Sequence, residues 1–307
     1  MRILIFGGLG MLGHQVYKTL SKHFTHVFVS VRKPVREIIK YNIYNPQYVI
    51  DNLDLLNHRS LEMVFKNTNP DIVINCVSAR KEKNQFMSNA DLAEINGTLP
   101  VRISDWCKRR SAQFIHFSSD DIFKGRNQPY SESSSPDSSE IIGRAKALGE
   151  TLNKKDLIFR SHFIGQELEL SNNIFSKLVN LNSEIENHII FSPEKIYSGV
   201  TTFYMSNLLT EIILKQIPLN GLFHVGALHP INEMKLVELI ISNFKLNIDI
   251  KKLVKNQNDS SSKPVILSSN KLIKAWPHNP PLWSNMINDL SFFYNLNKEK
   301  MKIQKAS

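Results

Sequence analysis

Short apolar runs alternate with segments of helical periodicity through the first half of the chain. The run at residues 3–6 is wholly apolar, as expected for a strand buried on both faces of a parallel sheet. Leu12, Val16 and Leu20 then recur every four residues and mark one face of a helix. Further strands are expected at residues 26–31, 70–77, 114–117 and 157–160. This alternation predicts βαβ units and an α/β fold.

The turn between the first strand and the first helix is rich in glycine. Gly7, Gly10 and Gly13 have a spacing that suits a dinucleotide: Gly7 permits a tight turn, Gly10 lets the backbone approach a pyrophosphate, and Gly13 lets helix and strand pack closely. The backbone N–H groups at the helix start, around Met11 and Leu12, would hold the anion. We therefore predict a dinucleotide site, with an ordinary glycine-rich turn as the alternative.

The second half of the chain mixes helices, expected at 203–214 and 234–244, with short loops. The predicted fold is a Rossmann-type doubly wound parallel sheet with a smaller C-terminal substrate-binding lobe. We assign residues 1–163 to the dinucleotide-binding domain, completed by about 192–226, and residues 164–191 and 227–307 to the lobe. A helix is expected at 89–110, with Pro100 at a bend or a helix start. Residues 298–307 are expected to form a solvated tail.

The end of the second predicted strand carries two cations. An NAD-selective site normally has an acidic residue at this position, but Arg32 and Lys33 stand here. They favour a 2′-phosphate, hence NADP(H) over NAD(H), unless they are simply solvated surface charges. Further cofactor contacts are predicted at Asp54 and Leu55, ahead of a short expected helix, with a solvated loop acid as the alternative for Asp54. Others are predicted at Val77, Ser78 and Ala79, at the end of the strand expected at 70–77.

Composition and charge bear on whether the protein binds nucleic acid, a metal or a membrane. The 307 residues carry a net charge of +10, but their Lys and Arg are scattered without interleaved aromatics, so we expect no nucleic-acid partner. Cys76 and Cys107 lack a metal-ligand spacing and are expected to be reduced packing residues, with no metal site. Met1 leads directly into the first strand, and no apolar run is long enough to cross a bilayer. We therefore expect a cytoplasmic protein without a membrane partner.

A polar stretch follows the strand at 114–117. It contains Ser118, Ser119, Asp120 and Asp121, at the carboxyl end of a strand, where open α/β sheets place their ligands. The helix expected after the next loop carries Gly143, Lys146, Gly149 and Glu150.

These segments, taken together, resemble the extended short-chain dehydrogenase/reductase superfamily, most closely the dTDP-4-dehydrorhamnose reductase branch of sugar-nucleotide proteins. The matching segments are 7–13, 54–55, 70–77, 117–120 with Phe123, 129–132, 143–150, 159–160 with 164–165, 199–202 and 221–224. Their order along nearly the whole chain is more specific than any one of them. The resemblance implies NADP(H) as cofactor and a nucleoside-diphosphate 4-keto or deoxy sugar as substrate, in cell-surface polysaccharide biosynthesis.

The resemblance also implies roles for single residues. A Ser or Thr polarises the substrate, a Tyr acts as general acid or base, and a Lys four residues later holds the ribose and lowers the pKa of the Tyr. Here Ser119 and Lys146 stand at the Ser/Thr and Lys positions, but Ile142 occupies the Tyr position and has no proton to transfer. Asn173, Phe175 and Thr201 are implied as substrate contacts.

The missing tyrosine leaves three interpretations open. In the first, the chain is a reductase, epimerase or dehydratase in which Asp120 or Asp121 supplies the proton. Asp120 is also a candidate turn cap, and the resemblance implies an aromatic residue where Asp121 stands. Tyr130, folded back from its loop, and His162, at a strand end, are weaker substitutes. In the second, the chain is a catalytically silent regulatory subunit that binds NADP(H) and a nucleotide sugar. In the third it keeps only the fold, which the intact glycine turn argues against. A homodimer is left open.

Overall fold

A computed structural model describes residues 1–80, 87–150, 153, 155–169, 173–179, 190–192, 195–248, 254–255 and 263–306. Its centre is a seven-stranded sheet in the order β11-β6-β5-β4-β1-β2-β3, with every neighbouring pair parallel. The strands are β1 (Arg2–Phe6), β2 (His26–Ser30), β3 (Val49–Ile50), β4 (Ile72–Asn75), β5 (Gln113–Ser118), β6 (Asp156–Arg160) and β11 (Gly221–His224). This confirms the predicted Rossmann-type sheet.

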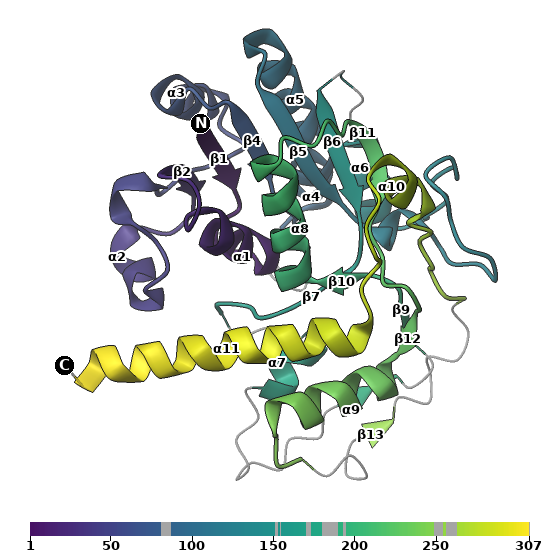
Figure 1. The fold of residues 1–307 in the computed structure, drawn as a ribbon. Coiled ribbons are helices and arrows are strands. Elements are labelled where there is room, and N and C mark those ends of the chain that lie inside the picture. Colours follow the sequence, from purple (N-terminus) through teal and green to yellow (C-terminus); the bar gives the residue numbers. More distant parts are fainter. Residues whose placement is uncertain are drawn as a thin grey trace.

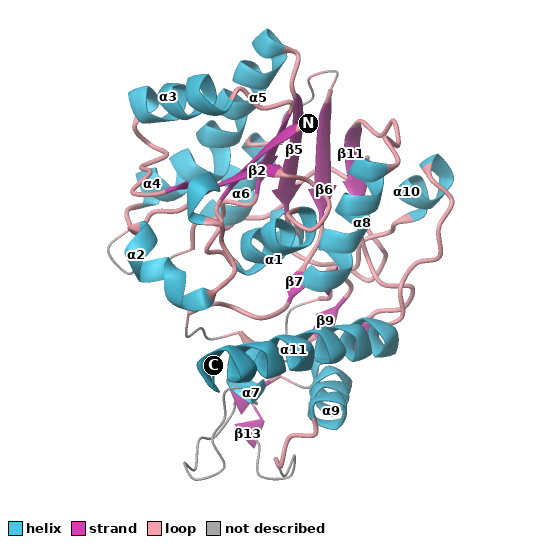
Figure 2. Cartoon of the chain, turned by 60° about the vertical axis from the view of Figure 1, so that its left-hand side comes forward, coloured by secondary structure: helices cyan, strands magenta, loops and turns pink. Residues whose placement is uncertain are grey.

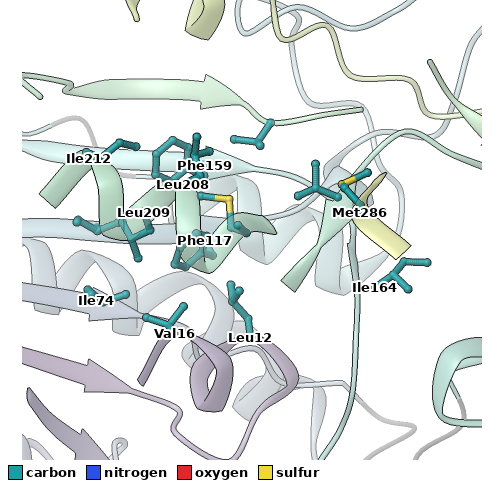
Figure 3. Packing of buried hydrophobic residues seen from close by; sticks show 14 of the residues in the cluster. Leu12, Val16, Ile74, Phe117, Phe159, Ile164, Leu208, Leu209, Ile212 and Met286 are labelled. Atoms are coloured by element: carbon teal, nitrogen blue, oxygen red, sulfur yellow. The ribbon is translucent and has the colours of Figure 1, made fainter. Parts of the chain in front are cut away.

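Alternate side chains of β1 enter two separate cores, which explains why this strand is apolar throughout. Ile3 and Ile5 belong to the core beneath α1 (Met11–Leu20) and α8 (Thr202–Leu214), shown in Figure 3. Leu4 and Phe6 belong to the core beneath α3 (His58–Thr68) and α5 (Leu99–Arg110). Helices therefore cover both faces of the sheet (Figures 1 and 2), as doubly wound folds require.

The helix predicted at 89–110 is built from three consecutive segments. They are α4 (Asn89–Ala93), a π-helical turn (Glu94–Thr98) and α5, whose first turn contains Pro100. Proline is tolerated there because the first turn of a helix has no partner for its N–H groups. Of the two places predicted for Pro100, a bend or a helix start, the structure shows the start of α5.

The chain beyond β6 supplies both the last sheet strand and a second group of elements. Helices α7 (Ile174–Val179), α9 (Glu233–Phe244) and α11 (Trp283–Ala306) lie together away from the sheet (Figures 1 and 2). Phe175 and Phe244 pack edge to face at 5.2 Å between ring centres. The remaining elements are α2 (Val35–Ile38), α6 (Ile141–Leu148), α10 (Asn270–Ala275), β7 (Phe163–Ile164), β8 (Ile190–Phe191), β9 (Ile196–Tyr197), β10 (Val200–Thr201), β12 (Ile231–Asn232) and β13 (Val254–Lys255).

The C-terminal residues and the predicted limits of the substrate-binding lobe can be compared with the structure in part. The tail predicted at 298–307 is helical as far as Ala306, because α11 continues through it; its Lys, Glu, Met, Gln and Ala residues favour helix and contain no breaker. Its solvated character stays a prediction. Residues 180–189 of the predicted lobe lie outside the described residues. The domain limits stay a prediction, although β11 does fall within the segment 192–226.

Candidate functional site

The glycine turn lies where the strand order reverses. β1 is flanked by β4 on one side and β2 on the other, so its carboxyl end borders the crevice in which doubly wound folds bind ligands. Gly7 has a positive φ of 86°, and a Cβ at Gly13 would lie 2.1 Å from the Gly7 carbonyl oxygen. Both residues must be glycine for α1 to begin this close to β1.

Gly10 is different, because the protein's own packing does not require a glycine there. A Cβ at Gly10 would meet the Gly7 oxygen at 3.3 Å, a tight contact that a small shift relieves, and its φ of −71° suits any residue. Gly10 caps α1 without a side chain, and the first bond of the helix runs from His14 N–H to the Gly10 oxygen. The N–H groups of Met11, Leu12 and Gly13 thus bond no group among the described residues, and they form a cradle suited to an anion.

Two side chains that sequence reasoning missed hold the loops beside this cradle. The Tyr44 hydroxyl donates to the Gly8 carbonyl oxygen at 2.7 Å. After β4, the Asn96 side chain accepts from Ala79 N–H at 3.1 Å and donates to the Ala79 oxygen at 3.0 Å. The loop with the predicted contacts Val77 and Ser78 is therefore anchored at Ala79. No pattern near Tyr44 or Asn96 marks these long-range contacts.

The predicted 2′-phosphate cations differ in their availability. Arg32 is exposed just beyond β2. The Lys33 ammonium instead binds the Glu169 carboxylate, and this hydrogen bond raises the pKa of Lys33. Asp54 is exposed and its carboxylate accepts Leu56 N–H at 2.9 Å, as in a turn cap, whereas Leu55 packs against the core under α3. Arg32 is thus the cation of this pair without a partner among the described residues.

A second cluster, the Asp121 cluster, lies just beyond the carboxyl end of β5. The Asp121 Oδ2 atom accepts from the Ser119 hydroxyl at 2.6 Å, the Lys146 ammonium at 3.0 Å and the Arg80 guanidinium at 2.5 Å. The side chains of Lys146, Asp121 and Arg80 are 7%, 27% and 38% exposed, so the cluster opens to solvent at Arg80. It carries two positive charges and one negative charge.

The charges of the Asp121 cluster determine whether its members can donate a proton at neutral pH. Burial raises the pKa of Asp121, but the charges of Lys146 and Arg80 and the hydrogen bond from Ser119 outweigh burial and hold this pKa far below its ordinary value. Burial lowers the pKa of Lys146, and the Asp121 charge opposes that change. Asp121 is therefore ionised at neutral pH, which makes it a poor proton donor and a good partner for Lys146.

Ile142, which the resemblance sets at the tyrosine position, adds no acid. Ile142 is half-buried one helical turn before Lys146 on α6, so both side chains lie on the same face of the helix. Tyr130 is buried in a separate small core and stacks on Phe123 with 3.9 Å between ring centres. It is thus packed away from Lys146's hydrogen-bonding partners, and the structure gives no support to the idea that it replaces the missing tyrosine.

A carboxylate and a histidine meet beside the Asp121 cluster. Asp120 begins the 3-10 turn Asp120–Ile122, and His162 follows β6. The His162 Nδ1 lies 3.3 Å from the Asp120 Oδ1, and the two side chains are 29% and 15% exposed. The register pairs Ser118 with Arg160, so each member of the pair stands two residues beyond matched positions of β5 and β6.

A buried ion pair fixes these strand ends. The Arg160 guanidinium donates twice to Glu150, at 2.7 and 2.5 Å, and the Ser118 hydroxyl donates to the same carboxylate at 2.7 Å. The Arg160 and Glu150 side chains are 4% and 8% exposed. His224 on β11 adds a contact of 3.3 Å to Arg160. The family-like segments around these residues thus have a structural role in holding β5, β6, β11 and the end of α6 together.

His14 and His116 are enclosed within the fold. The His14 Nδ1 contacts the Gly10 oxygen at 2.9 Å, and burial lowers the pKa of His14 to about 4. His116 contacts Asn75 at 3.2 Å within the sheet, and burial lowers its pKa to about 3. Both are neutral at pH 7 and pack inside the fold.

The three substrate contacts implied by resemblance have structural partners. Asn173 caps α7 by accepting Ser176 N–H at 2.8 Å, and it also donates to Glu167 at 3.1 Å. Phe175 is 1% exposed in the core, and Thr201 is 0% exposed and accepts Tyr204 N–H at 3.2 Å at the start of α8. Phe175 and Thr201 therefore present no surface to a ligand in this structure.

Among the described residues, no group of three or more His, Cys, Asp or Glu side chains is arranged to hold a metal ion. Within the same part of the chain, no helix has the length and apolar character needed to cross a bilayer.

The sheet order and the glycine turn define a Rossmann-type α/β protein. Residues 1–290 match the family model described as the RmlD substrate binding domain, and the chain belongs to this family. The family match confirms the resemblance to the dTDP-4-dehydrorhamnose reductase branch of extended short-chain dehydrogenases/reductases.

Solved structures share the fold over nearly the whole chain. A dTDP-4-dehydrorhamnose reductase from Bacillus anthracis in complex with NADP has a TM-score of 0.75 at 20% identity, covering 94% of this chain and 98% of that one. A dTDP-glucose 4,6-dehydratase from the same species in complex with NAD has a TM-score of 0.76 at 13% identity, covering 97% and 98%. At these identities the likeness establishes the fold alone.

Curated relatives match over a shorter range. A probable low-salt glycan biosynthesis reductase of Haloferax volcanii is 28% identical over 172 residues, 53% of this chain and 54% of the relative. The methionine adenosyltransferase 2 subunit beta of Xenopus laevis is 27% identical over 150 residues, 48% of this chain and 41% of the relative. The chain thus spans about half the length, or less, of these curated relatives.

Proposed function

We propose that this protein is an NADP(H)-dependent oxidoreductase acting on a nucleoside-diphosphate 4-keto or deoxy sugar in cell-surface polysaccharide biosynthesis. The observation that carries the proposal is the cradle at the start of α1, where N–H groups that bond no other described residue lie beside the crevice at β1. Gly10 supports it, because the fold itself does not need a glycine at this position.

The residues around the crevice fit such a cofactor. The cradle of Met11, Leu12 and Gly13 would hold the pyrophosphate, and Arg32 would pair with a 2′-phosphate. The Ala79 loop, anchored by Asn96, would border the nicotinamide half. When bound, the cofactor supplies or accepts a hydride. The known structures of this fold with NADP and with NAD support the cofactor class, while Arg32 favours NADP(H).

We assign the Asp121 cluster to binding and orientation. Lys146 donates to Asp121, whereas the family pairs this lysine with a tyrosine. The Ser119 hydroxyl donates to the same carboxylate. Arg80, the most exposed member, gives the cluster an excess positive charge that suits an anionic or hydroxyl-rich ligand. Because Asp121 is ionised, these residues position ligands and stabilise charge, and the proton must come from another group.

The direct test supplies the protein with NADPH deuterated at the transferable position and with 4-keto sugars linked to thymidine, uridine or guanosine diphosphate. The proposal predicts deuterium in one sugar product, detected by mass spectrometry, with matching loss of NADPH absorbance. Saturable binding of both ligands without hydride transfer to any sugar would contradict the enzymatic part of the proposal.

Replacing Arg32 by alanine tests the cofactor preference. We expect NADPH to bind about tenfold more weakly, the usual effect of losing one hydrogen bond to a charged group, and NADH to bind within about twofold of the parent protein. Lys33→Ala should have a smaller effect because Glu169 already holds its ammonium. The measurement is calorimetric titration with both cofactors.

The control for this prediction is Arg36→Ala, since Arg36 is also exposed but lies on α2 beyond the end of β2. It should leave both affinities unchanged. Equal losses for NADPH and NADH in the Arg32 variant would remove the case for a 2′-phosphate contact.

A second function is a catalytically silent subunit that binds NADP(H) and a nucleotide sugar. Ile142 at the tyrosine position and the Asp121–Lys146 ion pair favour it, because together they replace the family's proton-transfer arrangement. One curated relative is named as a subunit of an adenosyltransferase, which supports this alternative. The deuterium experiment separates the two functions.

A further inference from the structure

We propose that His162, oriented by Asp120, is the proton donor that replaces the missing tyrosine. This inference rests on the proposed reductase function. In the reducing direction, a hydride passes from the reduced nicotinamide to the carbonyl carbon of the sugar as the C=O π bond breaks. The carbonyl oxygen takes a proton from His162 Nε2, which leaves an alcohol, the oxidised cofactor and a neutral imidazole that regains its proton from water.

The position of the pair carries the argument. Asp120 and His162 extend from the carboxyl ends of the neighbouring strands β5 and β6, on the same side of the sheet as the glycine turn after β1. Asp120 and Asp121 are consecutive but bind different partners, so the short turn separates a proton-transfer pair from the cationic Asp121 cluster. A substrate at this edge of the sheet lies within reach of both.

The hydrogen bonding of the His162 ring suits a general acid. The Asp120 carboxylate lies against Nδ1, so the neutral ring carries its proton there, and Nε2 is the nitrogen that gains and loses the second proton. No hydrogen bond among the described residues uses Nε2, and the side chain is 29% exposed. A carboxylate on one ring nitrogen and an open second nitrogen is the arrangement in which a histidine transfers protons efficiently.

The surroundings hold the ring in place. His162 packs edge to face on Tyr197 of β9 at 5.2 Å between ring centres, and the Tyr197 hydroxyl donates to Glu233 at 2.6 Å. The Lys195 ammonium lies 5.1 Å from the Tyr197 ring centre on the same strand segment. The backbone is fixed as well, because Val200 N–H donates to the His162 oxygen at 2.9 Å. Among the described residues, Asp120, Tyr197, Glu233 and Lys195 are thus titratable groups near His162.

The experiment compares His162→Gln and Asp120→Asn with the parent protein in single-turnover NADPH oxidation with the keto sugar nucleotide that proves active. We expect His162→Gln to lower the rate of hydride transfer about 100-fold or more, and Asp120→Asn to lower it less. The parent rate should fall as the pH rises and His162 loses its proton, and this dependence should be absent in His162→Gln. His229→Gln is the matched control, because His229 is exposed, and it should react at the parent rate.

Two further measurements do not depend on turnover. Calorimetric titration should show NADPH binding to His162→Gln within about twofold of the parent, because the cradle is unchanged. Nitrogen-15 NMR of the ligand-free protein should show the neutral His162 ring protonated on Nδ1, and Asp120→Asn should weaken that preference.

The outcomes separate this inference from the function on which it rests. Parent-like hydride transfer in His162→Gln, or a neutral ring protonated on Nε2, would overturn the role of His162 while leaving the reductase in place. A parent protein that binds both ligands and transfers no hydride would overturn both.

Discussion

Replacing Gly10 by alanine is expected to weaken NADPH binding roughly 100-fold, or ~2.8 kcal/mol, while the fold stays intact. The added methyl group would stand where the pyrophosphate must approach the backbone. Within the protein its tightest contact would be the Gly7 oxygen at 3.3 Å, the Cys76 oxygen would lie at an ordinary 4.0 Å, and the φ of −71° is allowed for alanine. Calorimetric titration and thermal unfolding of the same sample measure the two effects.

Gly13→Ala is the contrasting variant in the same turn. Its Cβ would lie 2.1 Å from the Gly7 carbonyl oxygen, so helix and strand must move apart, and overpacking of this kind costs ~1–3 kcal/mol. We expect this variant to lose both stability and binding. If Gly10→Ala bound NADPH as tightly as the parent, the cradle at the start of α1 would not be the pyrophosphate site.

Replacing Glu150 by glutamine is expected to lower the free energy of unfolding by ~3–5 kcal/mol, because it leaves the buried Arg160 guanidinium without a countercharge. Glutamine keeps the shape of glutamate, so the lower free energy of unfolding reports the missing charge and not a cavity. Chemical denaturation followed by circular dichroism gives the value.

The control is the same substitution at Glu211, which pairs with Lys215 on the surface of α8 with side chains 43% and 65% exposed. Exposed pairs contribute ~1 kcal/mol or less, so Glu211→Gln should be nearly neutral. Equal losses in the two variants would mean that the Glu150–Arg160 pair does not hold the strand ends as we infer.

Local patterns were sufficient to predict most of the fold. The apolar run of β1 and the repeat of Leu12, Val16 and Leu20 follow from burial between two helical layers, which the two cores confirm. Helix α11 was missed, although Trp283, Met286, Ile287 and Leu290 are buried and recur with a helical period in its first turns.

The candidate site was less predictable because its contacts join distant parts of the chain. Lys33 could be recognised as a cation, but its pairing with Glu169 depends on the tertiary fold. The Asp120–His162 contact follows from the register that pairs Ser118 with Arg160, and register cannot be read from either strand alone. The two cations that bind Asp121 are equally distant in sequence, since Lys146 lies on α6 and Arg80 in the loop after β4.

The central claim is that the crevice beside β1 binds a nicotinamide dinucleotide with a 2′-phosphate. The most direct measurement is calorimetric titration of the parent protein with NADPH and, separately, with NADH. We predict one saturable site for NADPH and distinctly weaker binding of NADH. No saturable binding of either cofactor would contradict the claim.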